Sequence, residues 1–127
     1  NQYNQIDIGL DTFPCGGGIT TCDSLFMGVP VVSLSGRTAV GRGGRSILSN
    51  VGLPELIAQT PEEYKKIAVE LAGDTARLAE LRKTLRSRLQ GSPLMDAKGF
   101  ERDMEAAYRR MWRAAVNRGE NLEQANR

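Results

Sequence analysis

Residues Ile6 to Leu34 read IDIGLDTFPCGGGITTCDSLFMGVPVVSL, and the order of residue types in this run predicts one local architecture. An apolar alternation over 6–10 is typical of a strand, and the glycines of 16–18 remove side chains from the turn that follows. A helix over about 20–27 is ended by Gly28 and Pro30, and a second strand follows at 31–34. A strand that enters a helix through such a turn binds phosphate with backbone N–H groups and the helix dipole.

The first half of the chain is predicted as two βα units. The strand at 31–34 leads to a loop at 35–44 and a helix over about 45–51. Two strands separated by a helix predict a parallel crossover, and the continuous apolar run at 31–34 is typical of a sheet covered on both faces. We therefore expect an α/β fold whose sheet takes its other strands from the chain that precedes Asn1.

The second half of the chain is predicted as helical. Residues 60–63 form a capping box with proline at the first helical position, and this helix ends near Gly73. A second helix carries a leucine stripe and is broken at 91–93, after which a third helix begins beyond Asp96. The predicted organisation is a βαβα part over 1–58, helices that complete the domain over 59–116, and a polar tail over 117–127 that we expect to be disordered.

The third predicted helix has an apolar stripe. Phe100, Met104, Tyr108 and Trp112 recur at the spacing of one helix face. This pattern predicts that the four side chains belong to the core, packed against the earlier helices and the sheet.

Composition and charge exclude several function classes. The 127 residues are 40% hydrophobic and 25% charged with a net charge of +2, which does not predict a nucleic-acid partner. No apolar run approaches the roughly 20 residues that span a bilayer, so we expect no membrane partner. The chain begins at Asn1 and is already in a strand within a few residues, which predicts a piece of a longer polypeptide.

The chain has two cysteines and no histidine. The missing histidine excludes a Ser-His or Cys-His catalytic pair within these residues, and two thiols alone make a poor zinc site, so we expect no metal. Two thiols in such a chain are expected to be reduced, and this predicts a cytoplasmic location.

The turn and the start of the following helix carry the candidate chemistry. Thr20 and Thr21 offer hydroxyl donors beside the first free N–H groups, and Asp23, expected inside the first turn, is placed to accept hydrogen bonds from a ribose diol. Each residue alone also has a structural interpretation: a threonine caps a helix, an aspartate complements the helix dipole, and a glycine run is a loop.

The whole string from Leu10 to Leu34 resembles the nucleotide-binding half of GT-B glycosyltransferases, where a helix that carries an acidic residue ends in Met/Ala-Gly-x-Pro-Val-Val. More narrowly, it is similar to the O-GlcNAc transferase family. The resemblance continues through 35–38, Arg42, 51–58 and 92–94, and so covers nearly the whole chain. It implies the C-terminal portion of a Rossmann-like GT-B domain, with parallel strands and helices followed by C-terminal helices.

The same resemblance implies a function. Gly18, Ile19, Thr20 and Thr21 would hold the diphosphate of UDP, and Asp23 would bind the ribose. The reaction would move N-acetylglucosamine or a related sugar from a UDP-sugar to a serine or threonine hydroxyl of a protein acceptor, with no cofactor beyond the donor. Family members usually carry tetratricopeptide repeats before the catalytic region. A GT-B site lies between two domains, so no catalytic residue is assigned here and this chain alone is expected to be inactive.

Three other functions remain open from the sequence. The chain could belong to another GT-B transferase or to a sugar-nucleotide epimerase. It could be a non-enzymatic nucleotide- or phosphate-binding regulatory module. It could also be a helical interaction domain in which the glycine loop is only a linker. The sequence before Asn1 would discriminate among them, since tetratricopeptide repeats there favour protein glycosylation.

Overall fold

A computed structural model describes residues 2–125, with side chains described for residues 2–118. Its parallel sheet has the order β1-β2-β3 and consists of β1 (Gly9–Leu10), β2 (Val31–Leu34) and β3 (Ile57–Ala58). The predicted parallel crossover and the bounds of the central strand are confirmed. The first strand is shorter than the predicted 6–10: a 3-10 turn, η1 (Gln2–Gln5), precedes it, and β1 begins at Gly9, opposite Val31, the first residue of β2. The strand β3 was not predicted, and it gives β2 a second neighbour from within this chain.

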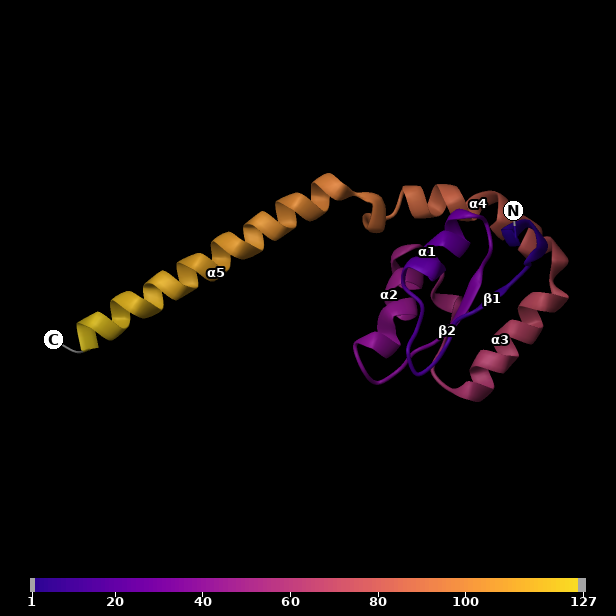
Figure 1. Ribbon diagram of the computed structural model, residues 1–127, viewed down its shortest axis with the longest axis horizontal. Helices are drawn as coiled ribbons and strands as arrows, with labels where there is room; N and C mark the ends of the chain where they lie inside the picture. Colours follow the sequence, from indigo (N-terminus) through magenta and orange to yellow (C-terminus); the bar gives the residue numbers. More distant parts are fainter. Residues whose placement is uncertain (1, 126–127) are drawn as a thin grey trace. The chain divides into compact units, whose positions relative to one another are not determined.

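Helices cover the sheet. Figure 1 shows α1 and α2 on one side of the strands and α3 on the other, and α4 contacts both α1 and α3. The helices in chain order are α1 (Ile19–Phe26), η2 (Val40–Arg42), α2 (Gly43–Asn50), η3 (Pro54–Leu56), α3 (Pro61–Gly73), α4 (Thr75–Gln90), η4 (Pro93–Met95) and α5 (Ala97–Ala125). The helix predicted at 45–51 begins two residues earlier, at Gly43.

The helices α1 and α2 end in the same way. Gly28 and Gly52 follow them with φ of +82° and +74°, a left-handed conformation that favours glycine. Each glycine N–H and the N–H of the next residue bond back to carbonyls of the helix, the pattern of a Schellman motif. A proline stands two residues after each glycine and prevents continuation of the helix. These stops direct the chain into buried segments, at Val29 and Pro30 after α1 and at Leu53 after α2.

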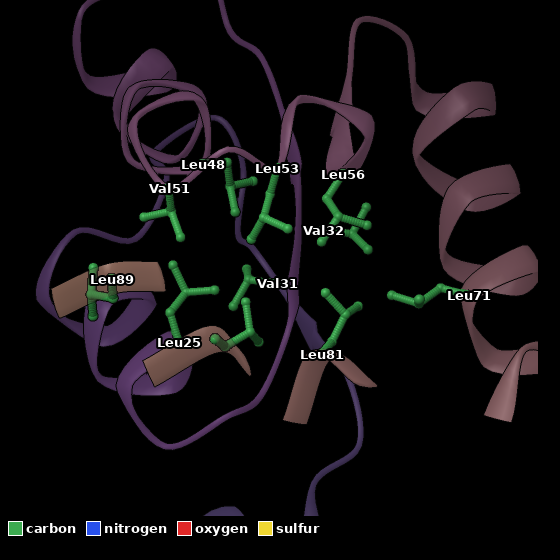
Figure 2. Close-up of a cluster of buried hydrophobic side chains, with 11 residues drawn as sticks. Leu25, Val31, Val32, Leu48, Val51, Leu53, Leu56, Leu71, Leu81 and Leu89 are labelled. Atoms are coloured by element: carbon green, nitrogen blue, oxygen red, sulfur yellow. The ribbon is translucent and has the colours of Figure 1, made fainter. Parts of the chain in front are cut away.

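The core lies between the sheet and its helices (Figure 2). Val32 of β2, Leu25 of α1, Leu48 of α2 and Leu85 of α4 are fully buried. Three strand residues in a row, Val31 to Ser33, are at most 3% exposed, which confirms that both faces of β2 are covered. The leucine stripe predicted for the second helix is confirmed, and the buried core residues are Leu25, Val31, Val32, Leu48, Val51, Leu53, Leu56, Leu71, Leu81, Leu85 and Leu89.

The predicted capping box of α3 is present with one shift of register. Thr60 Oγ1 accepts from Glu63 N–H at 3.1 Å, as predicted. The Glu63 carboxylate accepts from the N–H of Gln59 at 2.6 Å, one residue earlier than in the usual box. These two hydrogen bonds fix the start of α3, and so they fix the position of the next residue, Tyr64.

The chain divides into two compact units, Asn1–Met95 and Asp96–Arg127. In the second unit, α5 continues through Ala125, where a disordered tail was expected from 117; residues 126–127 of that tail lie outside the described residues. Within the second unit, the stripe predicted to be buried on this helix is not covered. Phe100, Tyr108 and Trp112 are 68%, 60% and 72% exposed, because a single helix offers no second layer of its own to cover them. Met104, at 36%, is also exposed.

One close approach joins the sheet to α2. Asp11 follows β1 directly, and its carboxylate accepts from the Ser33 hydroxyl of β2 at 2.7 Å. Gly44, in the first turn of α2, lies against this pair so closely that a Cβ added there would overlap Ser33 Oγ and Asp11 Oδ2. Glycine at this position therefore lets the start of α2 meet the buried carboxylate.

Within residues 2–125, no helix is both long enough and apolar enough to cross a membrane.

We expect Leu85→Ala to lower the free energy of unfolding by about 2–5 kcal/mol, because it opens a cavity in the core. Trp112→Ala is expected to change it by no more than about 0.5 kcal/mol, as for an exposed side chain. Urea unfolding of the two variants and the parent chain measures both changes. An equal loss for the two variants would show that the α5 stripe is buried in solution.

Gly44→Ala is expected to cost about 1–3 kcal/mol of stability, because the new methyl group must displace the Asp11–Ser33 pair or the helix. Gly43→Ala is the matched control: its Cβ would lie 3.5 Å from Gly17 O, an ordinary contact, and alanine favours the helix. Thermal melts of the two variants should separate, with only Gly44→Ala below the parent. Equal melting temperatures would contradict the close packing at Gly44.

Candidate functional site

A cleft of about 150 Å³, lined by several polar side chains, opens between the carboxyl end of β1 and the start of α1. The carboxyl ends of parallel strands are where α/β proteins bind ligands. Of the five predicted site residues, Thr20 and Thr21 line this cleft, whereas Gly18, Ile19 and Asp23 do not. The full lining is Gly9, Leu10, Asp11, Thr12, Gly17, Thr20, Thr21, Ser24 and Val31.

The floor of the cleft is organised by the buried side chain of Asp11, which is 7% exposed. Its Oδ1 accepts from the backbone N–H of Gly17 at 2.6 Å, and its Oδ2 accepts from the Ser33 hydroxyl at 2.7 Å. Both carboxylate oxygens are therefore hydrogen-bonded, as a buried charge requires. The first of these bonds fixes the middle of the glycine loop to the end of β1.

The same residue is held by its backbone. Asp11 N–H donates to Val32 O at 2.9 Å, and Asp11 O accepts from the Tyr64 hydroxyl of α3 at 2.8 Å. The Phe13 ring meets the Tyr64 ring edge to face, with centroids 6.0 Å apart. A strand, a loop and a helix from distant parts of the sequence thus converge on one residue.

Tyr64 stays protonated in this environment. Burial raises the pKa of its phenol, and the negative charge of Asp11 raises it further. The folded chain therefore favours the neutral phenol: this contribution to stability is fully present below the ordinary tyrosine pKa of about 10 and is lost as the pH rises through the raised value.

The helix α1 begins at Ile19, with Gly18 at its N-cap position and no side chain capping its first turn. The predicted helix start is thus one residue late, and the two threonines lie inside the first turn. Their hydroxyls gather at the glycine loop: a Cβ on Gly17 would lie 2.8 Å from Thr20 Oγ1 and 2.6 Å from Thr21 Oγ1. The arrangement places uncapped backbone N–H groups and two hydroxyls at one place, which is how a helix N-terminus binds an anion.

Asp23 was expected in the first turn of the helix, and this expectation is wrong. It is the fifth residue of α1, exposed, and on the side of Ile19 because residues four apart share a helix face. The Ile19 side chain is itself 81% exposed. Asp23 therefore lies one turn along the outer face of α1 and could reach only a ligand that passes over that face.

The two cysteines are both free. Burial raises the pKa of the Cys22 thiol, and the neighbouring Asp23 charge raises it further, so this thiol is neutral and weakly nucleophilic at neutral pH. Within residues 2–118, no three histidine, cysteine or acidic side chains come together as a metal site would require.

A larger hollow of about 460 Å³ lies at the other end of β1, between the strand and the helices α3 and α4. Its two charged residues pair with each other, since Arg82 lies 3.6 Å from Asp7. Arg82 also donates to Ile6 O at 2.5 Å. Apart from this pair, the only polar side chain in the lining is Thr75, whereas several polar side chains line the smaller cleft, which is therefore the better candidate.

Sequence reasoning missed Asp11, Ser33 and Tyr64. Asp11 had a usable signal, because an acidic residue directly after a β-strand of a parallel sheet stands at the ligand-binding edge. Ser33 is a polar residue inside an otherwise apolar strand, which indicates a buried partner. Tyr64 lies 53 residues from Asp11 and carries no local signal of the contact.

Comparison with known proteins identifies the family and the fold of this chain. The model of glycosyl transferase family 41 matches residues 2–104. A solved structure of a mutant O-GlcNAc transferase from Thermobaculum terrenum superposes with a TM-score of 0.82 and 46% identity, over 90% of this chain and 22% of that one. The match confirms the predicted α/β class and the assignment to a GT-B catalytic region.

Curated relatives give the same result. A Hordeum vulgare protein named as a probable UDP-N-acetylglucosamine–peptide N-acetylglucosaminyltransferase, SPINDLY, is 48% identical over 87% of this chain. A Caenorhabditis elegans UDP-N-acetylglucosamine–peptide N-acetylglucosaminyltransferase is 37% identical over 84% of it. The chain spans 12% of the first relative and 9% of the second. The names of these relatives favour none of the three alternatives that the sequence left open. Because the family model matches most of its residues, the chain belongs to glycosyl transferase family 41.

Proposed function

We propose that this chain is the donor-binding part of a glycosyltransferase that moves N-acetylglucosamine, or a related sugar, from a UDP-sugar to serine or threonine hydroxyls of proteins. The observation that carries the proposal is the uncapped start of α1 beside a glycine loop that Asp11 fixes. Membership of family 41 and the names of the relatives support the choice of donor and acceptor.

The diphosphate of the donor is assigned to the first turn of α1. The backbone N–H groups of 18–21 and the hydroxyls of Thr20 and Thr21 are the donors for its oxygens. In the reaction, the bond between the sugar C1 and the phosphate oxygen breaks, and a new bond forms to the acceptor hydroxyl. The same donors then stabilise the charge that develops on the departing UDP, and their fixed positions require no reorganisation.

Asp23 is retained as the residue for the uridine ribose. It stands four residues after Ile19, about 6 Å along the helix axis at 1.5 Å per residue. A nucleoside diphosphate whose phosphates meet the helix start could therefore place its ribose hydroxyls over the outer face of α1. Ser24, which lines the cleft and bonds to Thr20 O at 2.8 Å, is the competing group if the ribose enters the cleft instead.

Other parts of the proposal concern the whole protein. We propose that tetratricopeptide repeats precede the catalytic region, that the enzyme is cytoplasmic, and that the donor needs no additional cofactor. The base that takes the acceptor proton is assigned to no residue of this chain. Because a GT-B site forms between two domains, the chain by itself is expected to transfer no sugar.

The ribose assignment is tested by measuring UDP affinity of the full-length protein by calorimetry. Asp23→Asn is expected to weaken UDP binding about tenfold to a hundredfold, as for the loss of hydrogen bonds to a charge worth about 1.5–3 kcal/mol. Ser24→Ala is the matched comparison in the cleft, and Glu62→Gln, on the exposed first turn of α3, is the remote control. Neither is expected to change UDP affinity. A loss of UDP affinity with Ser24→Ala and none with Asp23→Asn would place the ribose in the cleft.

The reaction is tested separately. If the full-length protein binds UDP but transfers no sugar from UDP-N-acetylglucosamine to any Ser/Thr peptide, the proposed reaction is contradicted.

A further inference from the structure

One surface of the chain carries positive charge without any acidic residue. From Ser24 to Pro54 the sequence contains three arginines and no aspartate or glutamate, a formal charge of +3 over this stretch. Two of these arginines, Arg42 and Arg45, line a hollow of about 410 Å³ along α2 together with Ser46, Ser49 and Asn50. We call these five residues the α2 surface.

The charges of the α2 surface are not neutralised within the fold. The ion pairs among residues 2–118 involve Arg77, Arg82, Lys66 and Arg109, and none involves the α2 surface. Arg42 donates one N–H to Arg37 O at 2.7 Å, which holds its side chain across the loop and leaves its other N–H groups for a ligand. Arg45 is exposed and has no ion-pair partner among these residues.

The shape of the surface is linear. Its members follow the spacing i, i+3, i+4, i+7 and i+8, so they lie on one helix face. From Arg42 to Asn50 this face is about 12 Å long at 1.5 Å per residue, the length of roughly three to four extended residues. A short extended peptide fits such a face better than a single small anion does.

The position of the surface connects it to the proposed donor site. The helix α2, labelled in Figure 1, starts beside that site, because Gly44 lies against Asp11 and Ser33. A Cβ on Gly43 would lie 3.5 Å from Gly17 O of the glycine loop. A peptide with its hydroxyl at the donor site would therefore have its neighbouring residues within reach of Arg42 and Arg45.

We infer that the α2 surface binds carboxylate side chains of the protein acceptor, within about four residues of the serine or threonine that receives the sugar. The inference rests on the proposed function. A nucleic acid is not favoured, because residues 27–63 contain no aromatic side chain for base stacking and the whole chain has a net charge of only +2. Guanidinium groups pair well with carboxylates, and the hydroxyls of Ser46 and Ser49 can donate to peptide carbonyls.

The test uses the full-length enzyme, UDP-N-acetylglucosamine and two synthetic peptides. Each peptide has one serine, and they differ only in carrying Asp or Asn at two positions within four residues of it. The acidic peptide is expected to have the higher kcat/KM. Arg45→Gln is expected to reduce the ratio of the two kcat/KM values about two- to fivefold, the range for an exposed ion pair, and Arg45→Glu is expected to reverse it. Raising the salt from about 0.05 M to about 0.5 M should diminish the ratio, because it shortens the screening length.

The control is Arg88→Gln, which removes an exposed arginine of α4, outside the α2 surface, and should leave the ratio unchanged. Equal kcat/KM for the two peptides, or an acidic preference that persists in Arg45→Glu, overturns this inference while the proposed function stands. Absence of transfer to either peptide overturns the proposed function and this inference with it.

Discussion

The buried carboxylate of Asp11 is the constraint on which the arrangement of the first unit depends. It lies at the end of β1 and must have a partner for each oxygen, since an unpaired buried charge is costly. The partners are the N–H of Gly17 and the hydroxyl of Ser33, at 2.6 and 2.7 Å. The start of α2 lies directly beside the Asp11 carboxylate. Residue 44 is therefore a glycine, because there is no space for a side chain at this position. A polar residue in the central strand, a glycine in the loop before α1 and a glycine in the first turn of α2 thus have one common cause.

This constraint also explains how a glycine loop can serve as a binding site. Glycines alone give a mobile loop, because they lose more conformational freedom on folding than other residues do. The bond from Gly17 to Asp11 removes that freedom at the point where the loop enters α1. The backbone N–H groups at the start of α1 are then fixed in place, and no side chain caps them. Fixed, uncapped N–H groups are suited to bind the oxygens of a diphosphate. Rigidity comes from the aspartate and binding capacity from the helix.

The sequence predicted what depends on local chemistry. The central strand, the start of α3 at Thr60 and the glycine stop of α1 follow from periodicity, capping and backbone preference. It did not predict β3, whose two residues are too few to show a period. Nor did it predict the contact between Tyr64 and Asp11, which depends on the tertiary fold. The apolar stripe of α5 has the spacing of a core-packing helix. This spacing does not show which other helix or sheet the stripe would pack against, or whether that partner belongs to the same unit.

We propose that the Asp11-fixed loop presents the first turn of α1 to the diphosphate of a UDP-sugar. A crystal structure of the full-length protein with UDP would show where the phosphates bind. Phosphate oxygens are expected about 2.7–3.2 Å from backbone nitrogens of Gly18 to Thr21, the distance of an N–H···O hydrogen bond. The bond from Gly17 to Asp11 is expected to be intact. Phosphates bound elsewhere, with the first turn of α1 facing only water, would contradict this proposal.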